Sequence, residues 1–104
     1  MLLPVAAQKA PHINAAISQV VKEMYPDVQH IRYEFAQDWT GQWAVFFRVL
    51  LSDEASKREN LREIAPRVVW SMSEKLYVPD LGLFPHFYFR SESEQKQVNE
   101  PAWA

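Results

Sequence analysis

The chain has 104 residues, the length of a single domain, and its 48% hydrophobic and 23% charged residues are ordinary for a globular protein. Eleven basic and thirteen acidic residues give a formal net charge of −2, so the composition excludes the strong positive field typical of proteins that bind nucleic acids or anionic membranes. Cysteine is absent, which excludes disulfides, thiolate chemistry and zinc sites built on cysteine.

The chain begins with an apolar stretch, MLLPVAAQKAP, which is short, is broken by Pro4 and has no basic residue before it. These properties favour a mature N-terminus over a secretory signal. No stretch of the sequence supplies the roughly 20 apolar residues that a membrane-spanning helix needs. We therefore expect a cytoplasmic protein.

A first helix is predicted over residues 11–24, PHINAAISQVVKEM, because its apolar residues recur at helical spacing. They are Ile13, Ile17, Val20, Val21 and Met24. Pro11 suits the first turn of a helix, where its missing N–H costs little. Tyr25 precedes Pro26 and is therefore pushed out of the α region, so the helix should end there.

Residues 28–51 predict two strands joined by a hairpin. Residues 28–36 alternate, with Ile31, Tyr33 and Phe35 on one face and His30, Arg32 and Glu34 on the other. Asp38 and Gly41 then supply turn chemistry. Residues 43–51, WAVFFRVLL, are apolar on both faces, which predicts a central strand or one whose second face is covered.

The segment 52–76 is predicted to be helical, with Ser52 and Asp53 as candidate N-caps and Ser56 with Glu59 as a candidate capping box. Its apolar stripe consists of Leu61, Ile64, Ala65, Val68, Val69, Met72 and Leu76. Pro66 lies inside this stripe, where proline removes a hydrogen bond. Because the stripe keeps its phase across Pro66, the pattern fits either one kinked helix or two short helices.

The last predicted strand covers residues 84–91, with Phe87 and Phe89 on one face and His86, Tyr88 and Arg90 on the other. Residues 92–104 are predicted to be a polar C-terminal tail of low order. The sequence thus predicts a single two-layer α+β domain over residues 1–91, in which both helices pack on one face of a three-stranded sheet. The other face is then uncovered in a monomer.

No motif of catalysis, metal binding or cofactor binding is present. His12, His30 and His86 fall on three different predicted elements, and no pair of them has the spacing of metal ligands. The two glycines of the chain cannot form a glycine-rich phosphate loop. We therefore expect a protein without enzymatic activity, metal or cofactor; an enzymatic alternative would use His86 with Tyr88.

The uncovered face carries aromatic residues and arginines together. Phe46, Leu50 and Tyr88 make it more apolar than a solvated face should be, which favours a homodimer or another protein partner. The plainer interpretation is a solvated face with cross-strand charge pairs such as Glu34 with an arginine. RNA is a further alternative, because aromatic rings stack on bases and arginines bind phosphates. Its candidate contacts are Arg32, Arg48, His86, Tyr88 and Arg90.

Three tryptophans fall outside the expected core pattern. Trp70 lies about half a turn from the centre of its apolar stripe, so it is either an interface anchor or a ring that Pro66 turns back over the core edge. Trp39, in the hairpin, is predicted to be a lid over the core. Trp103 can be a core residue only if the tail docks, for example on a neighbouring subunit or a partner. The predicted interface residues are therefore Phe46, Leu50, Trp70, Tyr88 and Trp103.

If Pro66 divides two helices, the element order α-β-β-α-α-β over residues 11–91 resembles the type II KH-like arrangement, which some ribosome-assembly factors share. The resemblance is one of topology and implies an RNA-binding domain. KH domains hold the nucleic-acid backbone with a GxxG loop, whereas the break in this chain reads EIAPR. The sequence therefore predicts a small non-enzymatic protein-interaction module, homodimeric or a subunit of a larger complex. The alternative is a KH-like RNA-binding domain without a GxxG loop.

Overall fold

The computed structural model describes residues 10–76 and 82–104. In chain order these form helix α1 (Ala10–Met24), strands β1 (Val28–Gln37) and β2 (Trp43–Leu51), helix α2 (Arg58–Leu76), strand β3 (Phe84–Ser91), helix α4 (Glu92–Val98) and the 3-10 helix η2 (Pro101–Trp103). The N-terminal stretch interpreted above and residues 77–81 of the connection before β3 lie outside the described residues. No helix in the described part is both long enough and apolar enough to cross a membrane.

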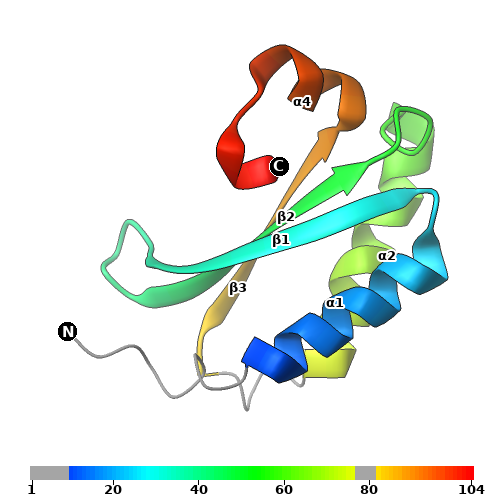
Figure 1. The fold of residues 1–104 in the computed structure, drawn as a ribbon. Helices are drawn as coiled ribbons and strands as arrows, with labels where there is room; N and C mark the ends of the chain where they lie inside the picture. Colours follow the sequence, from blue (N-terminus) through cyan, green and yellow to red (C-terminus); the bar gives the residue numbers. More distant parts are fainter. Residues whose placement is uncertain (1–9, 77–81) are drawn as a thin grey trace.

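β2 is the central strand of a three-stranded sheet with the order β1-β2-β3. It runs antiparallel to β1 and parallel to β3, and the register places Phe47 between Tyr33 and Phe87. α1 and α2 lie side by side on one face of this sheet, whereas α4 and the C-terminal end lie on the other side (Figure 1). The predicted α+β fold, with two helices on one face of a three-stranded sheet, is confirmed. We call the helix-covered side the first face and the opposite side the second face.

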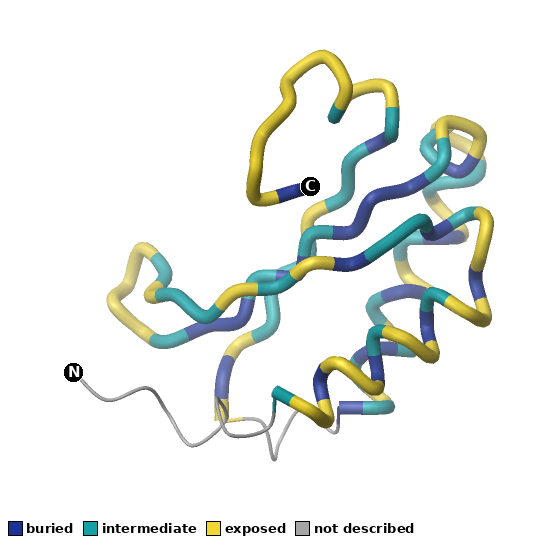
Figure 2. The backbone as a smooth tube through the Cα atoms, in the orientation of Figure 1, coloured by how far each residue is buried: buried dark blue, intermediate teal, exposed yellow. Residues whose placement is uncertain are grey.

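The hydrophobic core lies between the first face and the two helices. Alternation along β2, and along β1 from Ile31 onward, directs every second side chain to this core, and the register shift between Val28 and His30 brings Val28 to the same side. These side chains are Val28, Ile31, Val45, Phe47, Val49 and Leu51, all buried. They meet the helical stripes of Ile13, Ala16, Val20, Met24, Ile64, Val68, Met72 and Leu76. Figure 2 shows the buried positions gathered on the strands and on the sides of the helices that face them.

Helix α2 runs without interruption through Pro66, so the single-helix alternative is the one observed. Its start differs from the sequence prediction, because α2 begins at Arg58 rather than near residue 52. The Ser52 hydroxyl instead accepts a hydrogen bond from the Ala55 amide at 3.1 Å, inside a turn that precedes the helix. Ala55 is buried in the core. Its packing there stabilises the turn, so the chain does not form another turn of helix before Arg58.

Residues 92–104, predicted as a polar tail of low order, are ordered as α4 and η2. α4 begins with a capping box, in which the Ser91 hydroxyl accepts from the Glu94 amide at 3.1 Å and the Glu94 carboxylate accepts from the Ser91 amide at 3.3 Å. Asp53, predicted to cap α2, accepts a hydrogen bond from the Ser93 amide at 2.9 Å instead. This contact ties α4 to the loop that follows β2.

The chain after α4 returns to the second face of the sheet. Asn99 ends α4 in the left-handed conformation, with φ 55°, and η2 then contacts β2. Trp103 becomes buried there, with 6% of its surface exposed. The second face is therefore partly covered within one protomer, contrary to the expectation from sequence that it is open along its whole length.

Phe46 and Phe47 are adjacent on β2 and provide a matched test of the two faces. Phe47→Ala empties a fully buried site, so the free energy of unfolding should fall by about 3–5 kcal/mol. Phe46→Ala, at a half-buried position on the second face, should cost only roughly 1 kcal/mol. Urea denaturation followed by circular dichroism measures both values, and equal losses would contradict the assignment of the faces.

Candidate interaction surface

A row of aromatic rings stands on the second face, at the end next to the turn between β1 and β2. The ring centroids are 5.7 Å apart for Trp39 and His86, 5.0 Å for His86 and Phe46, and 6.1 Å for Phe46 and Tyr88. The plane of Phe46 lies within 17° of that of His86 and within 11° of that of Tyr88. Strand register produces this order, because Phe46 on β2 pairs with His86 on β3. We call these four residues the aromatic row.

The ends of the aromatic row are open to solvent. Trp39 keeps 82% of its surface exposed and Tyr88 keeps 45%, while the two rings between them are half-buried. Phe84, which alternation places on the same face as His86, is 63% exposed. The prediction that Trp39 is a lid over the core is therefore wrong. It is instead the outermost ring of a surface row.

Asp38 holds the turn that carries Trp39. One carboxylate oxygen of Asp38 accepts hydrogen bonds from the Thr40 amide at 2.9 Å, the Thr40 hydroxyl at 2.6 Å and the Gln42 amide at 3.1 Å. Gly41, with φ 86°, supplies the left-handed residue that closes the turn. The ring of Trp39 is thus positioned by a polar turn rather than by the core.

The same carboxylate lies close to the aromatic row. The hydrogen bonds from Thr40 and Gln42, together with the neighbouring His86, lower the pKa of Asp38 below its ordinary value. The Nε2 atom of His86 is buried, 4.0 Å from the Asp38 carboxylate, and finds no hydrogen-bond partner among the described residues. Asp38 therefore remains ionised at neutral pH and adds a negative charge beside the row.

The arginines of the second face are engaged within the protomer. Arg48 on β2 pairs with Glu34 on β1 at 2.5 Å, which is the cross-strand pair of Glu34 with an arginine that the sequence suggested. Arg90 on β3 pairs with Glu100 at 2.7 Å and donates to Gln95 at 3.0 Å. These contacts neutralise the positive charges that flank the aromatic row.

The far end of the second face is occupied by residues 99–104, which we call the C-terminal latch. The ring of Trp103 lies under the guanidinium of Arg90, at 4.4 Å from the ring centroid. Arg32 donates a hydrogen bond from Nε to the Ala104 carbonyl at 3.0 Å. Leu50 points to the second face at this end of β2, and only 8% of its surface is exposed.

The structure brings together most, but not all, of the residues singled out from the sequence. Phe46 and Tyr88 are in the aromatic row, and Leu50 and Trp103 are buried at the latch end of the same face. The candidate RNA contacts Arg32, Arg48, His86, Tyr88 and Arg90 also share this face. Trp70 does not, because it lies on α2, on the other side of the sheet. Trp39 and Phe84 also lie on this surface, but the sequence did not predict them as interface residues. Phe84 could have been found, because it lies two residues before His86 on β3 and therefore faces the same way.

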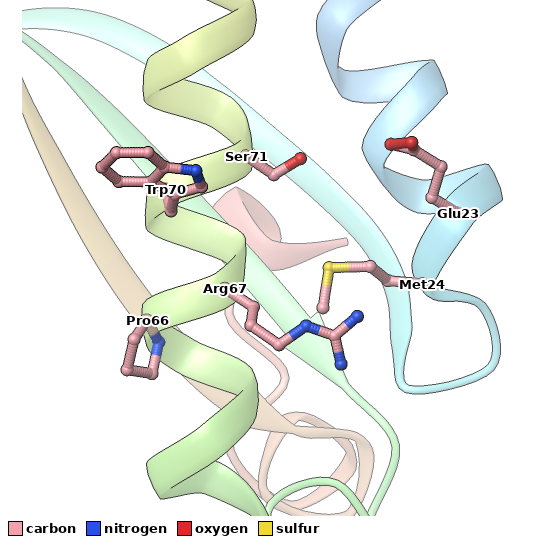
Figure 3. A pocket seen from close by; sticks show the side chains of 6 residues that line it. All are labelled: Glu23, Met24, Pro66, Arg67, Trp70 and Ser71. Carbon is pink, nitrogen blue, oxygen red and sulfur yellow. The ribbon is translucent and has the colours of Figure 1, made fainter.

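Trp70 lies on the outer side of α2 with 71% of its surface exposed. The interpretation that Pro66 turns this ring back over the core edge is therefore wrong, and its role as an interface anchor stays a prediction. Trp70 borders an open groove of about 460 Å³ between α1 and α2, into which Arg67 extends toward Met24 (Figure 3). Lys75 bridges the two helices by pairing with Glu23 at 3.1 Å.

A second groove, of about 550 Å³, follows the edge of the sheet between α1 and β1. His30 lies in its wall, and burial together with the charge of Arg32 lowers the pKa of His30. The imidazole is therefore neutral at neutral pH. Among residues 10–76 and 82–104, no three histidine, aspartate or glutamate side chains gather in a way that could hold a metal ion.

No protein-family model, curated protein or solved structure matches this chain.

The turn at Asp38 gives a testable pH dependence. Because the pKa of Asp38 is lowered on folding, its contribution to stability is complete above the unfolded pKa and is lost as the pH falls through the folded pKa. Thr40→Val removes the hydroxyl donor and should raise the titration midpoint toward the roughly 3.9 of an unperturbed aspartate. Thr40→Ser keeps the hydroxyl and serves as the control. Carboxyl ¹³C NMR measures each midpoint, and identical midpoints for the valine variant and the unmodified chain would refute the assigned cause.

Proposed function

We propose that this protein is a small non-enzymatic interaction module that self-associates through the aromatic row. The observation that carries the proposal is the exposure of large rings on a sheet face, above all Trp39 and Tyr88. Apolar patches of this kind are typical of docking surfaces. Tryptophan and tyrosine are also enriched among the few residues that dominate binding energy at protein interfaces.

The charges around the aromatic row favour a second copy of the chain as the partner. Glu34 neutralises Arg48 and Glu100 neutralises Arg90, so the edge of the row is nearly neutral apart from Asp38 beside His86. A surface of this kind does not select a strongly acidic or basic partner. It also permits two identical surfaces to meet around a twofold axis without strong repulsion.

The size of the exposed surface predicts a weak dimer. At about 200 Å² per ring, the exposed parts of Trp39, Tyr88 and Phe84 supply roughly 400 Å² of apolar surface. A standard protein interface buries about 800 Å² on each partner. We therefore expect reversible self-association at high protein concentration rather than a permanent dimer.

RNA binding by a KH-like domain is the weaker candidate. Its three candidate arginines share one face, but Arg48 and Arg90 pair with carboxylates and Arg32 donates to a backbone carbonyl. Phe46 is already stacked against two protein rings, whereas a base-binding platform offers open ring faces. The unbroken α2 also lacks the loop between two helices with which KH domains hold a nucleic-acid backbone.

Substitution of single rings tests the proposal. Trp39→Ala and Tyr88→Ala are each expected to weaken self-association roughly tenfold, as the loss of an aromatic anchor does at an interface. Trp70→Ala is the matched control, because its ring is exposed to a similar degree but lies on the helical side of the sheet. Sedimentation velocity over a concentration series measures the association constant of each variant.

Two results would contradict the proposal. One is a chain that stays monomeric at its highest attainable concentration. The other is self-association that weakens with Trp70→Ala and not with Trp39→Ala. A titration with single-stranded RNA at low salt tests the alternative, since binding that weakens with added salt and with Arg32→Ala would favour a nucleic-acid ligand.

A further inference from the structure

Few contacts hold the C-terminal latch, residues 99–104, against the sheet. Trp103 is the only buried residue of α4 and η2. The remaining contacts of the latch with the sheet are polar: Glu100 with Arg90, and the Ala104 carbonyl with Arg32. Glu100 is itself half exposed to water, so its ion pair adds little to the stability of the closed latch.

We propose that the C-terminal latch opens and closes over the second face and thereby limits self-association of the chain. This inference rests on the proposed function, because the latch and the aromatic row share one face of the sheet. The occupant of the opened surface is the same second copy that docks on the aromatic row. The latch is then an intramolecular competitor for part of the interface.

The local structure permits this opening without unfolding of the domain. Asn99 has the left-handed conformation that ends α4, and beyond it Gln95 of α4 donates a hydrogen bond to the Glu100 carbonyl at 2.8 Å, which opening has to break. The start of α4 keeps its capping box and its contact with Asp53 when the latch opens. Closing the latch costs the conformational entropy of residues 99–104, and among their side chains only the ring of Trp103 becomes buried. Segments with so few buried contacts open most readily. The core between the helices and the first face is not involved.

Opening would extend the docking surface along β2. Leu50 and Phe46 point to the same face, and Leu50 is buried at the latch end. On opening, Arg90 would lose Glu100 and Arg32 would lose the Ala104 carbonyl, so the charge of Arg90 would no longer be neutralised within the protomer and the second copy would have to supply its counter-charge. The exposed rings of the aromatic row together with Phe84 supply roughly half of the 800 Å² that each partner of a standard interface buries. The surface under the latch adjoins the row and adds to it, which explains why closure would weaken association.

Thiol labelling measures the opening directly, because the chain has no cysteine of its own. A single thiol introduced as Leu50→Cys is shielded while the latch is closed and reacts when it opens. Val49→Cys, which faces the core on the same strand, reports only on unfolding of the domain. We expect the Leu50→Cys chain to react with a soluble disulfide reagent at least tenfold faster than the Val49→Cys chain. Adding Glu100→Gln should increase the labelling rate of the Leu50→Cys chain and leave that of the Val49→Cys chain unchanged.

The effect on association is measured with variants that loosen the latch. Trp103→Ala should tighten self-association, by up to roughly a hundredfold if the latch of each copy is closed about nine-tenths of the time and both must open. Glu100→Gln should tighten it only a few-fold, because its ion pair adds little to the stability of the closed latch. Gln97→Ala, at an exposed position of α4, is the control and should leave the association constant unchanged. Glu100→Gln keeps every apolar side chain, so its effect cannot come from a newly exposed cavity.

The outcomes separate the latch from the proposed function. Equal labelling rates at positions 49 and 50 would mean that the latch opens only on unfolding, which overturns the inference. Faster labelling at position 50 without tighter association in Trp103→Ala and Glu100→Gln overturns the gating role. If neither the unmodified chain nor any variant self-associates, the proposed function is wrong, and so is the proposal that the latch limits self-association. The labelling rates still decide whether the latch opens.

Discussion

Strand β2 carries apolar side chains on both faces and has a hydrogen-bonded neighbour on each side, so both of its faces need cover. α1 and α2 cover Phe47 completely. On the second face, only Trp103 of the C-terminal segment is buried, at the end near Leu50. Phe46 is left with the rings of His86 and Tyr88 as neighbours. The aromatic row is therefore the part of the second face that the described residues leave uncovered.

The polar groups of the second face determine what kind of partner this surface suits. Its arginines are paired with carboxylates or donate to carbonyl groups, and Asp38 is occupied by the turn that positions Trp39. A partner therefore meets rings, arginines that are already engaged, and the ionised but hydrogen-bonded carboxylate of Asp38. Such a surface favours apolar contact with another protein over recognition of phosphates. The C-terminal latch occupies the far end of the same face.

The repeating patterns of the sequence predicted the regular elements well. Alternation gave β2 and β3 with the boundaries that the structure has, and it placed Phe46 and Phe47 on opposite faces. Contacts between distant segments could not be predicted, because Asp53 with Ser93 and Arg90 with Trp103 depend on how the chain returns to the sheet. One local signal was available: the spacing of Ser91 and Glu94 is that of a capping box, although the polar composition around it favoured a disordered tail. Trp39 gave no comparable signal, since a turn residue has no fixed face.

In the proposed dimer, the aromatic row is the contact between two copies of the chain. Chemical shifts of the unmodified chain, followed by ¹H–¹⁵N NMR in a dilution series, test this claim residue by residue. If the aromatic row is the contact, the signals that move with concentration are those of Trp39, Phe46, His86 and Tyr88, and Trp70 and its neighbours on α2 do not move. Shifts confined to the groove between α1 and α2, or spectra that do not change with concentration, would contradict it.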